Sequence, residues 1–161
     1  MNPDRRKLLS ASVSAAASLF FGGGVFADSE SILKAIEEFT DGNSADNSDM
    51  LNLETPKIAE NGHSVAVSVT MASPMTADDH VESVMILADD NPNPEVALFH
   101  FSPLSGEAKV STRMRLARTQ NVIAIAKLSD GTLHKASNHV DVTIGGCGSV
   151  SYTHLTLPTK A

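Results

Sequence analysis

The sequence contains one cysteine, Cys147, and no tryptophan among its 161 residues. A single cysteine cannot form an internal disulfide, so a hydrophobic core must hold the fold, and 42% of the residues are hydrophobic. The 6 histidines are scattered, and no pair has the close spacing of a zinc site. We therefore expect one domain of modest size, with no metal site and no bound cofactor.

Basic residues are also scarce. The 12 lysines and arginines are outnumbered by 19 aspartates and glutamates, which gives a formal net charge of −7. A negative protein repels nucleic-acid phosphates and anionic lipid headgroups. The composition therefore excludes nucleic acid and membrane surfaces as expected partners.

Long apolar runs are absent except at the N-terminus. There the stretch Leu8–Phe26 follows Arg5 and Arg6, and a small-x-small site ends at Ala27. The stretch is rich in alanine, serine and glycine, which argues against a membrane anchor. We predict that residues 1–27 are an export signal removed after Ala27, with no membrane span remaining. The adjacent arginines are typical of twin-arginine signals, so the expected location is the periplasm.

The rest of the chain predicts one short helix followed by strands. Residues 28–49 form a helix and linker, and the helix has an apolar stripe that docks on the main domain or on a partner: Ile32, Leu33, Ile36 and Phe39. Residues 50–144 alternate between short apolar runs and turn markers such as Asn61-Gly62, which predicts an all-β, immunoglobulin-like antiparallel β-sandwich. The clearest strands are expected at 64–70, 81–88, 95–101, 108–116, 122–128, 132–136 and 139–144. In the first of these, Val65, Val67 and Val69 share one face.

The strand at 95–101 is apolar on both faces. It carries Val96, Leu98, Phe99 and Phe101. This pattern is typical of a strand with one face in the core and the other under a partner. A wholly intramolecular central strand gives the same pattern, so both interpretations stay open.

Cys147 lies among glycines at the end of the last predicted strand, between Gly146 and Gly148 and after Gly145. A free cysteine is usually a small buried residue, but glycines supply no apolar neighbours for burial. We therefore predict that residues 145–148 form a flexible arm that exposes a reactive thiol. An odd cysteine in an exported protein also indicates either intermolecular pairing or a functional thiol.

Short blocks of sequence occur along the chain in a recognisable order: IAENG at 58–62, SPM at 73–75, NPNPEVA at 91–97, FHF at 99–101, TQNV at 119–122 and VTIGGCG at 142–148. With these blocks, the chain from about residue 56 to residue 148 resembles the SoxY family. Members of this family are the sulfur-carrier subunits of the bacterial thiosulfate-oxidising (Sox) system. The resemblance also implies the sandwich fold and the export signal.

The resemblance implies that Cys147 holds thiosulfate-derived sulfur covalently and that the carrier is not itself an enzyme. It implies a heterodimer with a SoxZ-like subunit. It also implies three enzyme partners: the haem enzyme SoxAX, which joins thiosulfate to the cysteine, the dimanganese hydrolase SoxB, which releases sulfate, and, where present, the molybdenum enzyme Sox(CD)2. The alternative is a non-carrier immunoglobulin-like binding or assembly module whose cysteine forms only intermolecular disulfides. A homodimer, through Cys147 or through an exposed sheet, fits either interpretation.

The C-terminal tail departs from the family pattern. The family's arm ends the protein as Gly-Gly-Cys-Gly-Gly, whereas Ser149 replaces the last glycine here and residues 150–161 follow. Residues 150–159 match the in-frame translation of a transposon-end adapter used in sequencing libraries. We therefore predict that residues 149–161 are an artefact of sequence assembly.

Overall fold

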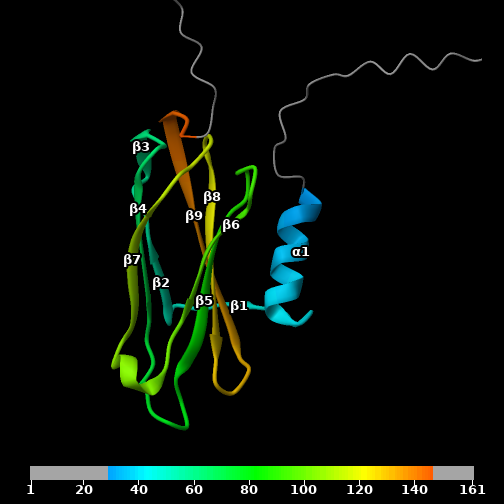
Figure 1. Ribbon diagram of the computed structural model, residues 1–161, viewed down its shortest axis with the longest axis vertical. Coiled ribbons are helices and arrows are strands. Elements are labelled where there is room, and N and C mark those ends of the chain that lie inside the picture. The colour runs from blue at the N-terminus through cyan, green and yellow to red at the C-terminus, as the bar shows by residue number, and fades with distance from the viewer. Residues whose placement is uncertain (1–28, 147–161) are drawn as a thin grey trace, which may run out of the picture.

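A computed structural model describes residues 29–146 as two β-sheets packed face to face, with a helix against the outside of the larger sheet (Figure 1). The predicted signal peptide with its cleavage site at Ala27 lies outside the described residues. The segment from Cys147 to the C-terminus, including Gly148, also lies outside them. Within the described part of the chain, no helix is long and apolar enough to cross a membrane.

The smaller sheet is antiparallel and has the order β2-β4-β7, with β2 at Leu51–Glu54, β4 at Val65–Met71 and β7 at Ala108–Met114. The larger sheet has the order β1-β9-β8-β5-β6, and β3 also pairs with β9. Its strands are β1 (Asp46–Asn47), β3 (Ile58–Asn61), β5 (Val81–Ala88), β6 (Glu95–His100), β8 (Gln120–Leu128) and β9 (Leu133–Ile144). A single turn of 3-10 helix, η1 (Pro103–Ser105), lies between β6 and β7.

The predicted β-sandwich is confirmed, but its strands are not all antiparallel. Both β1 and β3 run parallel to β9. The two strands predicted at 132–136 and 139–144 are one continuous strand, β9. On one side the first part of β9 pairs with β8, and on the other side its last part pairs with β3. This change of neighbour supplies hydrogen-bond partners along the whole strand, so β9 continues without a break near residues 137–138.

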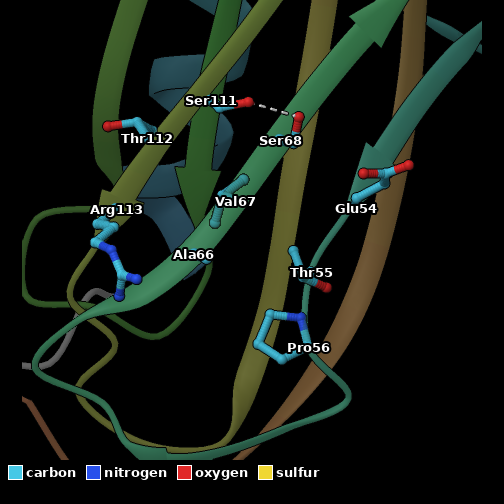
Figure 2. Close-up of a pocket in the computed structure, with 9 residues that line it drawn as sticks. All are labelled: Glu54, Thr55, Pro56, Ala66, Val67, Ser68, Ser111, Thr112 and Arg113. Carbon is cyan, nitrogen blue, oxygen red and sulfur yellow. Dashed lines mark hydrogen bonds between the residues drawn. The ribbon is translucent and has the colours of Figure 1, made fainter.

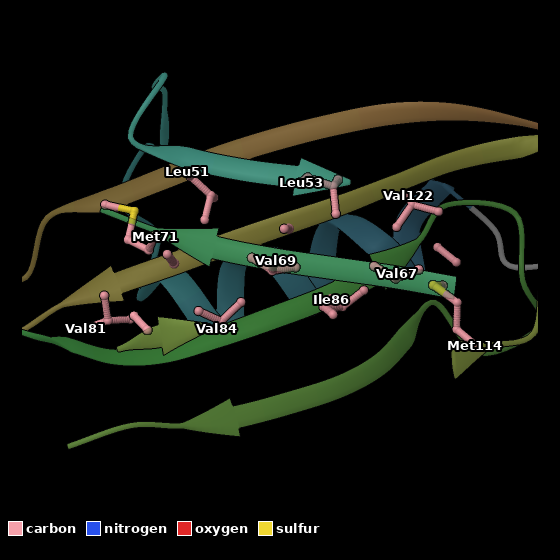
Figure 3. Close-up of a cluster of buried hydrophobic side chains, with 14 of the residues drawn as sticks. Leu51, Leu53, Val67, Val69, Met71, Val81, Val84, Ile86, Met114 and Val122 are labelled. Atoms are coloured by element: carbon pink, nitrogen blue, oxygen red, sulfur yellow. The ribbon is translucent and has the colours of Figure 1, made fainter. Parts of the chain in front are cut away.

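The main core lies between the two sheets and follows the period of two expected of half-buried strands. Val65, Val67 and Val69 point into it and are at most 2% exposed, as their alternation predicted. Figure 3 shows side chains from both sheets meeting in this layer, with Val67 and Val69 on β4 and Val84 and Ile86 on β5. The burial of this apolar surface is the main source of stability for a domain without a disulfide.

Strands β5 and β8 are buried on both faces because helix α1 (Ser29–Thr40) covers the outside of the larger sheet. The residues that meet there are Ile32, Ala35, Ile36 and Phe39 of the helix and Met85, Leu87, Ile123, Ile125 and Leu133 of the sheet. The predicted helix is therefore confirmed, and it docks on this domain. Leu33, which was expected in the same stripe, is 64% exposed and Ala35 takes its place. Each helical residue turns by about 100°, so Leu33 faces away from its neighbour Ile32.

Candidate functional site

Segments that are distant in the sequence meet at one end of the sandwich, where β9 ends. They are the turn after β3, the loop after β5, the loop between β7 and β8, and residues 145–146. Figure 1 shows this end at the top of the view, where β3, the end of β9 and the β7–β8 loop come together. Cys147 follows these residues directly in the sequence. This end of the sandwich is therefore the candidate functional site, and we call residues 145–146 the arm root.

The arm root is tied to its surroundings by backbone hydrogen bonds. Gly146 N–H donates to the carbonyl of Leu116 at 2.7 Å, and Leu116 N–H donates to the carbonyl of Gly62 at 2.8 Å. Gly62 N–H in turn donates to the carbonyl of Ile144 at 2.7 Å. Gly146 is buried, while Gly145 and Ile144 are exposed. The β3 turn and the β7–β8 loop thus hold the chain on both sides up to the residue before the cysteine.

The glycines of the arm root allow close contact between backbones. A Cβ atom at Gly145 would overlap the carbonyl oxygen of Ala117, and one at Gly146 would overlap the carbonyl of Gly62 and lie 2.7 Å from the nitrogen of His63. We expected Gly145 and Gly146 to be flexible, but the structure places Gly146 in a buried, hydrogen-bonded position. The flexibility of residues 145–148 stays a prediction, since most of the predicted arm lies at or beyond the end of the described residues. Glycine is present at these positions because no side chain fits there.

A pair of buried amide side chains holds the β7–β8 loop. The carboxamide oxygen of Asn91 accepts from Ala117 N–H at 2.9 Å and from Gln120 Nε2 at 3.0 Å, while Asn91 Nδ2 donates to the carbonyl of Arg115 at 2.8 Å. Gln120 Oε1 accepts from Asp90 N–H at 2.9 Å, and its Nε2 also donates to the carbonyl of Arg118 at 3.0 Å. Asn91 is 6% exposed and Gln120 is 3% exposed. Buried amides with this many satisfied groups fix a loop in one conformation.

The same loop is joined to β9 and to the loop after β5 by further polar contacts. Thr119 Oγ1 accepts from Val142 N–H at 2.9 Å, which continues the ladder beyond the last β8–β9 pair. Arg118 and Asp90 form an ion pair at the surface. The first contact joins the β7–β8 loop to β9, and the second joins it to the loop after β5. The loop that carries Leu116 and Ala117 is therefore braced from several directions.

The structure brings most of the family-like blocks together, but not all of them. The blocks at 58–62, 91–97, 119–122 and 142–146 contribute to the arm root and its supports. The block at 73–75 follows β4 at the opposite end of the sandwich.

In the β8–β9 turn, also at that end, Thr132 N–H donates to the Asp130 carboxylate and holds the pKa of that carboxyl below its ordinary value.

Sequence reasoning missed the residues that contact the arm root. Leu116 and Ala117 lie in a loop without a motif, and their contribution is made by backbone atoms, which leave no pattern in the sequence. The partnership of Asn91 and Gln120 joins residues far apart in the chain. The family-like blocks did include Asn91 and Gln120, but they did not indicate that the two side chains bind each other. The Asn61-Gly62 turn was predicted, and the structure confirms it, with Asn61 Oδ1 accepting from His63 N–H at 2.8 Å.

The described residues also form a hollow of about 640 Å³ on the outer face of the smaller sheet, shown in Figure 2. Ala66 and Ser68 of β4 form its floor, Ser111 and Arg113 of β7 flank it on one side, and residues 54–56 flank it on the other. It contains no residue of the arm root. No group of three or more histidine, cysteine, aspartate or glutamate residues that could hold a metal ion occurs within residues 29–146.

Strand β6 is the edge of the larger sheet in the described structure, pairing with β5 alone. Val96, Phe99 and Phe101 pack against the main core, whereas Leu98 faces outward and is 42% exposed. A groove of about 430 Å³ lies between β6 and α1, lined by Leu98, His100, Glu95, Met85, Phe39 and Glu38 among others. Of the two interpretations of this apolar run, the structure excludes the central strand and leaves one face of β6 uncovered.

The geometry defines the class: a small β-sandwich protein whose last strand leads, through a pair of tightly packed glycines, to the only cysteine in the sequence. The sequence also matches the family described as sulfur oxidation protein SoxY over residues 36–147, a range that ends on Cys147. That match covers well over half of the chain. This chain belongs to the SoxY family.

A solved structure supports the same assignment. The sulfur carrier protein SoxY from Chlorobium limicola f. thiosulfatophilum is 30% identical and superposes with a TM-score of 0.60, covering 73% of this chain and 100% of that one. Superoxide reductases share the fold alone. One from Ignicoccus hospitalis is 16% identical (TM-score 0.52, 58% of this chain and 80% of that one), and a putative one from Thermotoga maritima is 21% identical (TM-score 0.53, 61% and 93%). No curated protein matched the chain.

Proposed function

We propose that this protein is a sulfur carrier that holds thiosulfate-derived sulfur covalently on Cys147 and presents it to partner enzymes. The observation that carries the proposal is that the SoxY family match extends through Cys147, the only thiol in the sequence. The likeness to a solved sulfur carrier supports it. The arm root supports it as well, because it brings the chain to the end of the sandwich immediately before the cysteine.

The chemistry proposed for Cys147 is the formation and cleavage of sulfur–sulfur bonds. In loading, the thiolate bonds to the outer sulfur of thiosulfate to give Cys–S–S–SO₃⁻, and the two electrons released pass to a haem enzyme of the SoxAX type. In unloading, water attacks the sulfonate sulfur, so that sulfate and two protons leave and Cys–S–S⁻ remains, with SoxB as the hydrolase. Sox(CD)2, where present, oxidises the sulfur that remains. The carrier contributes a thiol and a docking surface, and catalysis belongs to its partners.

The proposed location is the periplasm, reached through a signal of the twin-arginine type. Arg5 and Arg6 before the apolar stretch, and the small-x-small site at Ala27, support this proposal. Cleavage there makes Asp28 the first residue of the mature chain. An intact mass for the exported protein that corresponds to any other N-terminus would contradict the assignment.

The proposed structural partner is a SoxZ-like subunit that covers the outward face of β6. Its support is that β6 has one open edge in the described structure, an exposed Leu98 and a groove between it and α1. An apolar side chain exposed beside an unpaired strand edge is a common feature of surfaces that bind another chain. In the absence of this partner, we expect the protein to form homodimers, either through the same face of β6 or through a disulfide at Cys147. A charge introduced at Leu98 distinguishes this proposal from the others.

The deciding experiment measures the intact mass of the full chain after incubation with thiosulfate and the haem enzyme. We expect a covalent adduct that a reductant removes and that is absent in Cys147→Ser. A disulfide-linked dimer with no adduct would instead indicate a binding or assembly module whose cysteine only cross-links it. Turnover of thiosulfate without a lasting adduct would indicate an enzyme. Either of these results would reject the carrier role.

A further inference from the structure

We propose that Gly62, Gly145 and Gly146 form a fixed base for the carrier arm, and that Gly62 is the residue that positions Cys147. This inference rests on the proposed function, because the placement of Cys147 matters only if it bears the cargo. The two glycines before the cysteine then belong to the fixed base and not to a free tether.

The steric argument centres on the missing side chain of Gly62. A Cβ atom there would overlap the carbonyl oxygen of Leu116 and lie 2.7 Å from the nitrogen of Gly146. These are the acceptor and the donor of the hydrogen bond that holds the arm root at 2.7 Å. A side chain at position 62 would therefore occupy the place of that bond. Real Cβ atoms do not come so close to backbone atoms, so one of the two segments would have to move.

Backbone conformation does not explain these glycines. Among the described glycines, positive φ values occur at Gly42, Gly106 and Gly131, each of which has open space where a Cβ would be. Gly62, Gly145 and Gly146 have the opposite combination: their φ values are open to any residue, and the space is filled. The three are therefore glycine because backbones pack against one another there, and the packed group includes β3, the β7–β8 loop and the end of β9.

The consequence for a carrier is a short reach. An extended residue spans roughly 3.3–3.6 Å, so fixing Gly145 and Gly146 shortens the free tether by about 7 Å compared with an arm that moves from Ile144 onward. A partner enzyme must then approach the end of the sandwich closely. Around the arm root this end presents exposed side chains of His63, Arg115 and Arg118. A fixed base also lowers the entropy lost when the thiol enters an enzyme site, because fewer backbone torsions remain to be ordered.

The direct test is amide hydrogen exchange at Gly146, followed by NMR in the full chain. We expect its exchange to be at least roughly a hundredfold slower than in an unstructured peptide, as for other buried, hydrogen-bonded amides. In Gly62→Ala this protection should fall by roughly tenfold or more, while the amide of Ile125, in the centre of β8, keeps its protection. Exchange of the Gly146 amide at the peptide rate in the unaltered protein would overturn the proposal without any variant.

Gly106→Ala is the matched control. Its φ of 73° makes alanine unfavourable, so it strains the fold, but it lies beside η1, away from the arm root. It should leave the Gly146 exchange rate unchanged relative to Ile125. If Gly62→Ala fails to fold, Gly145→Ala serves instead, because it contacts only the carbonyl of Ala117 and lies beyond the end of β9. Equal effects of the control and either arm-root variant would show general destabilisation and reject the positioning role.

A functional measurement separates this inference from the carrier role. In Gly62→Ala we expect enzyme-catalysed loading of Cys147 to lose roughly tenfold in kcat/KM, while the reaction of the thiol with a small disulfide reagent changes by less than about threefold. Unchanged loading kinetics would refute the positioning role and leave the carrier role intact. The absence of any adduct on the unaltered protein would refute the carrier role, whatever the exchange data show.

Discussion

Replacement of Gln120 by alanine should destabilise the protein by more than the loss of one hydrogen bond would. Gln120 is 3% exposed and makes three hydrogen bonds, to Asp90 N–H, to the carboxamide oxygen of Asn91 and to the carbonyl of Arg118. A net contribution of about 0.5–1.5 kcal/mol is typical for each bond, and a buried donor left without a partner costs about 1–3 kcal/mol. Arg118 is exposed, so water can replace Gln120 at its carbonyl. The expected loss is therefore about 2–4 kcal/mol.

The assay is equilibrium unfolding in urea followed by far-ultraviolet circular dichroism, because the chain has no tryptophan for fluorescence. Asn138→Ala is the matched control. Asn138 is half-buried, and its side-chain amide donates one bond, at 2.6 Å, to the carbonyl of Leu53. Its loss should cost about 1 kcal/mol. The reasoning is refuted if Gln120→Ala is no more costly than this control while the slope with urea stays constant.

The isosteric variant Gln120→Glu sharpens the same prediction. An ionised carboxylate keeps the acceptor for Asp90 N–H but loses both donated bonds, and its charge is buried against the carboxamide oxygen of Asn91. Burial should raise the pKa of the introduced carboxyl in the folded state above its unfolded value. The cost should then be greatest above that folded pKa and should shrink as the pH falls toward the unfolded value. A cost that does not depend on pH would contradict this explanation.

Two further predictions concern the helix and the edge strand. Phe39→Ala should lower the free energy of unfolding by about 1–3 kcal/mol. This is less than for a fully buried phenylalanine, because Phe39 is half-buried against the larger sheet. Leu33→Ala, at an exposed site on the same helix, should cost under about 0.5 kcal/mol in the same urea titration. Leu98→Asp should weaken binding of a SoxZ-like subunit by roughly tenfold or more in calorimetry, whereas Leu104→Asp, on η1 outside the β6 groove, should leave binding unchanged. Equal binding by both variants would show that the partner does not bind at β6.

Local patterns predicted the elements of this fold well. The β5 range of 81–88 agrees with the structure, and the valines of β4 face the core as their alternation indicated. A period of two survives in a strand with one buried face, so it can be read without knowing the neighbours. The break predicted near residues 137–138 was wrong, because β9 continues by exchanging one partner strand for another. Partner exchange is a property of the sheet and leaves no local signal.

At the candidate site, too, the sequence predicted local features but not the contacts between distant segments. Cys147 and its flanking glycines are visible in the sequence, and composition alone suggests a flexible arm. The buried, hydrogen-bonded state of Gly146 depends on Gly62 and Leu116, which lie 84 and 30 positions earlier in the numbering of the chain. Glycine permits both free movement and close packing. Only the neighbours in space decide which of the two applies at a given position.

The sequence by itself determined that this chain is a small β protein with one thiol, and its ordered blocks identified the family. It could do so because alternation, turn residues and short motifs are local properties of the chain. The tertiary structure alone decided that α1 covers the larger sheet, that β6 is left at an edge of the described sheet, and that the arm root packs closely against Gly62 and the β7–β8 loop. Those facts depend on contacts between backbones and side chains distant in sequence, which form only when the whole core assembles.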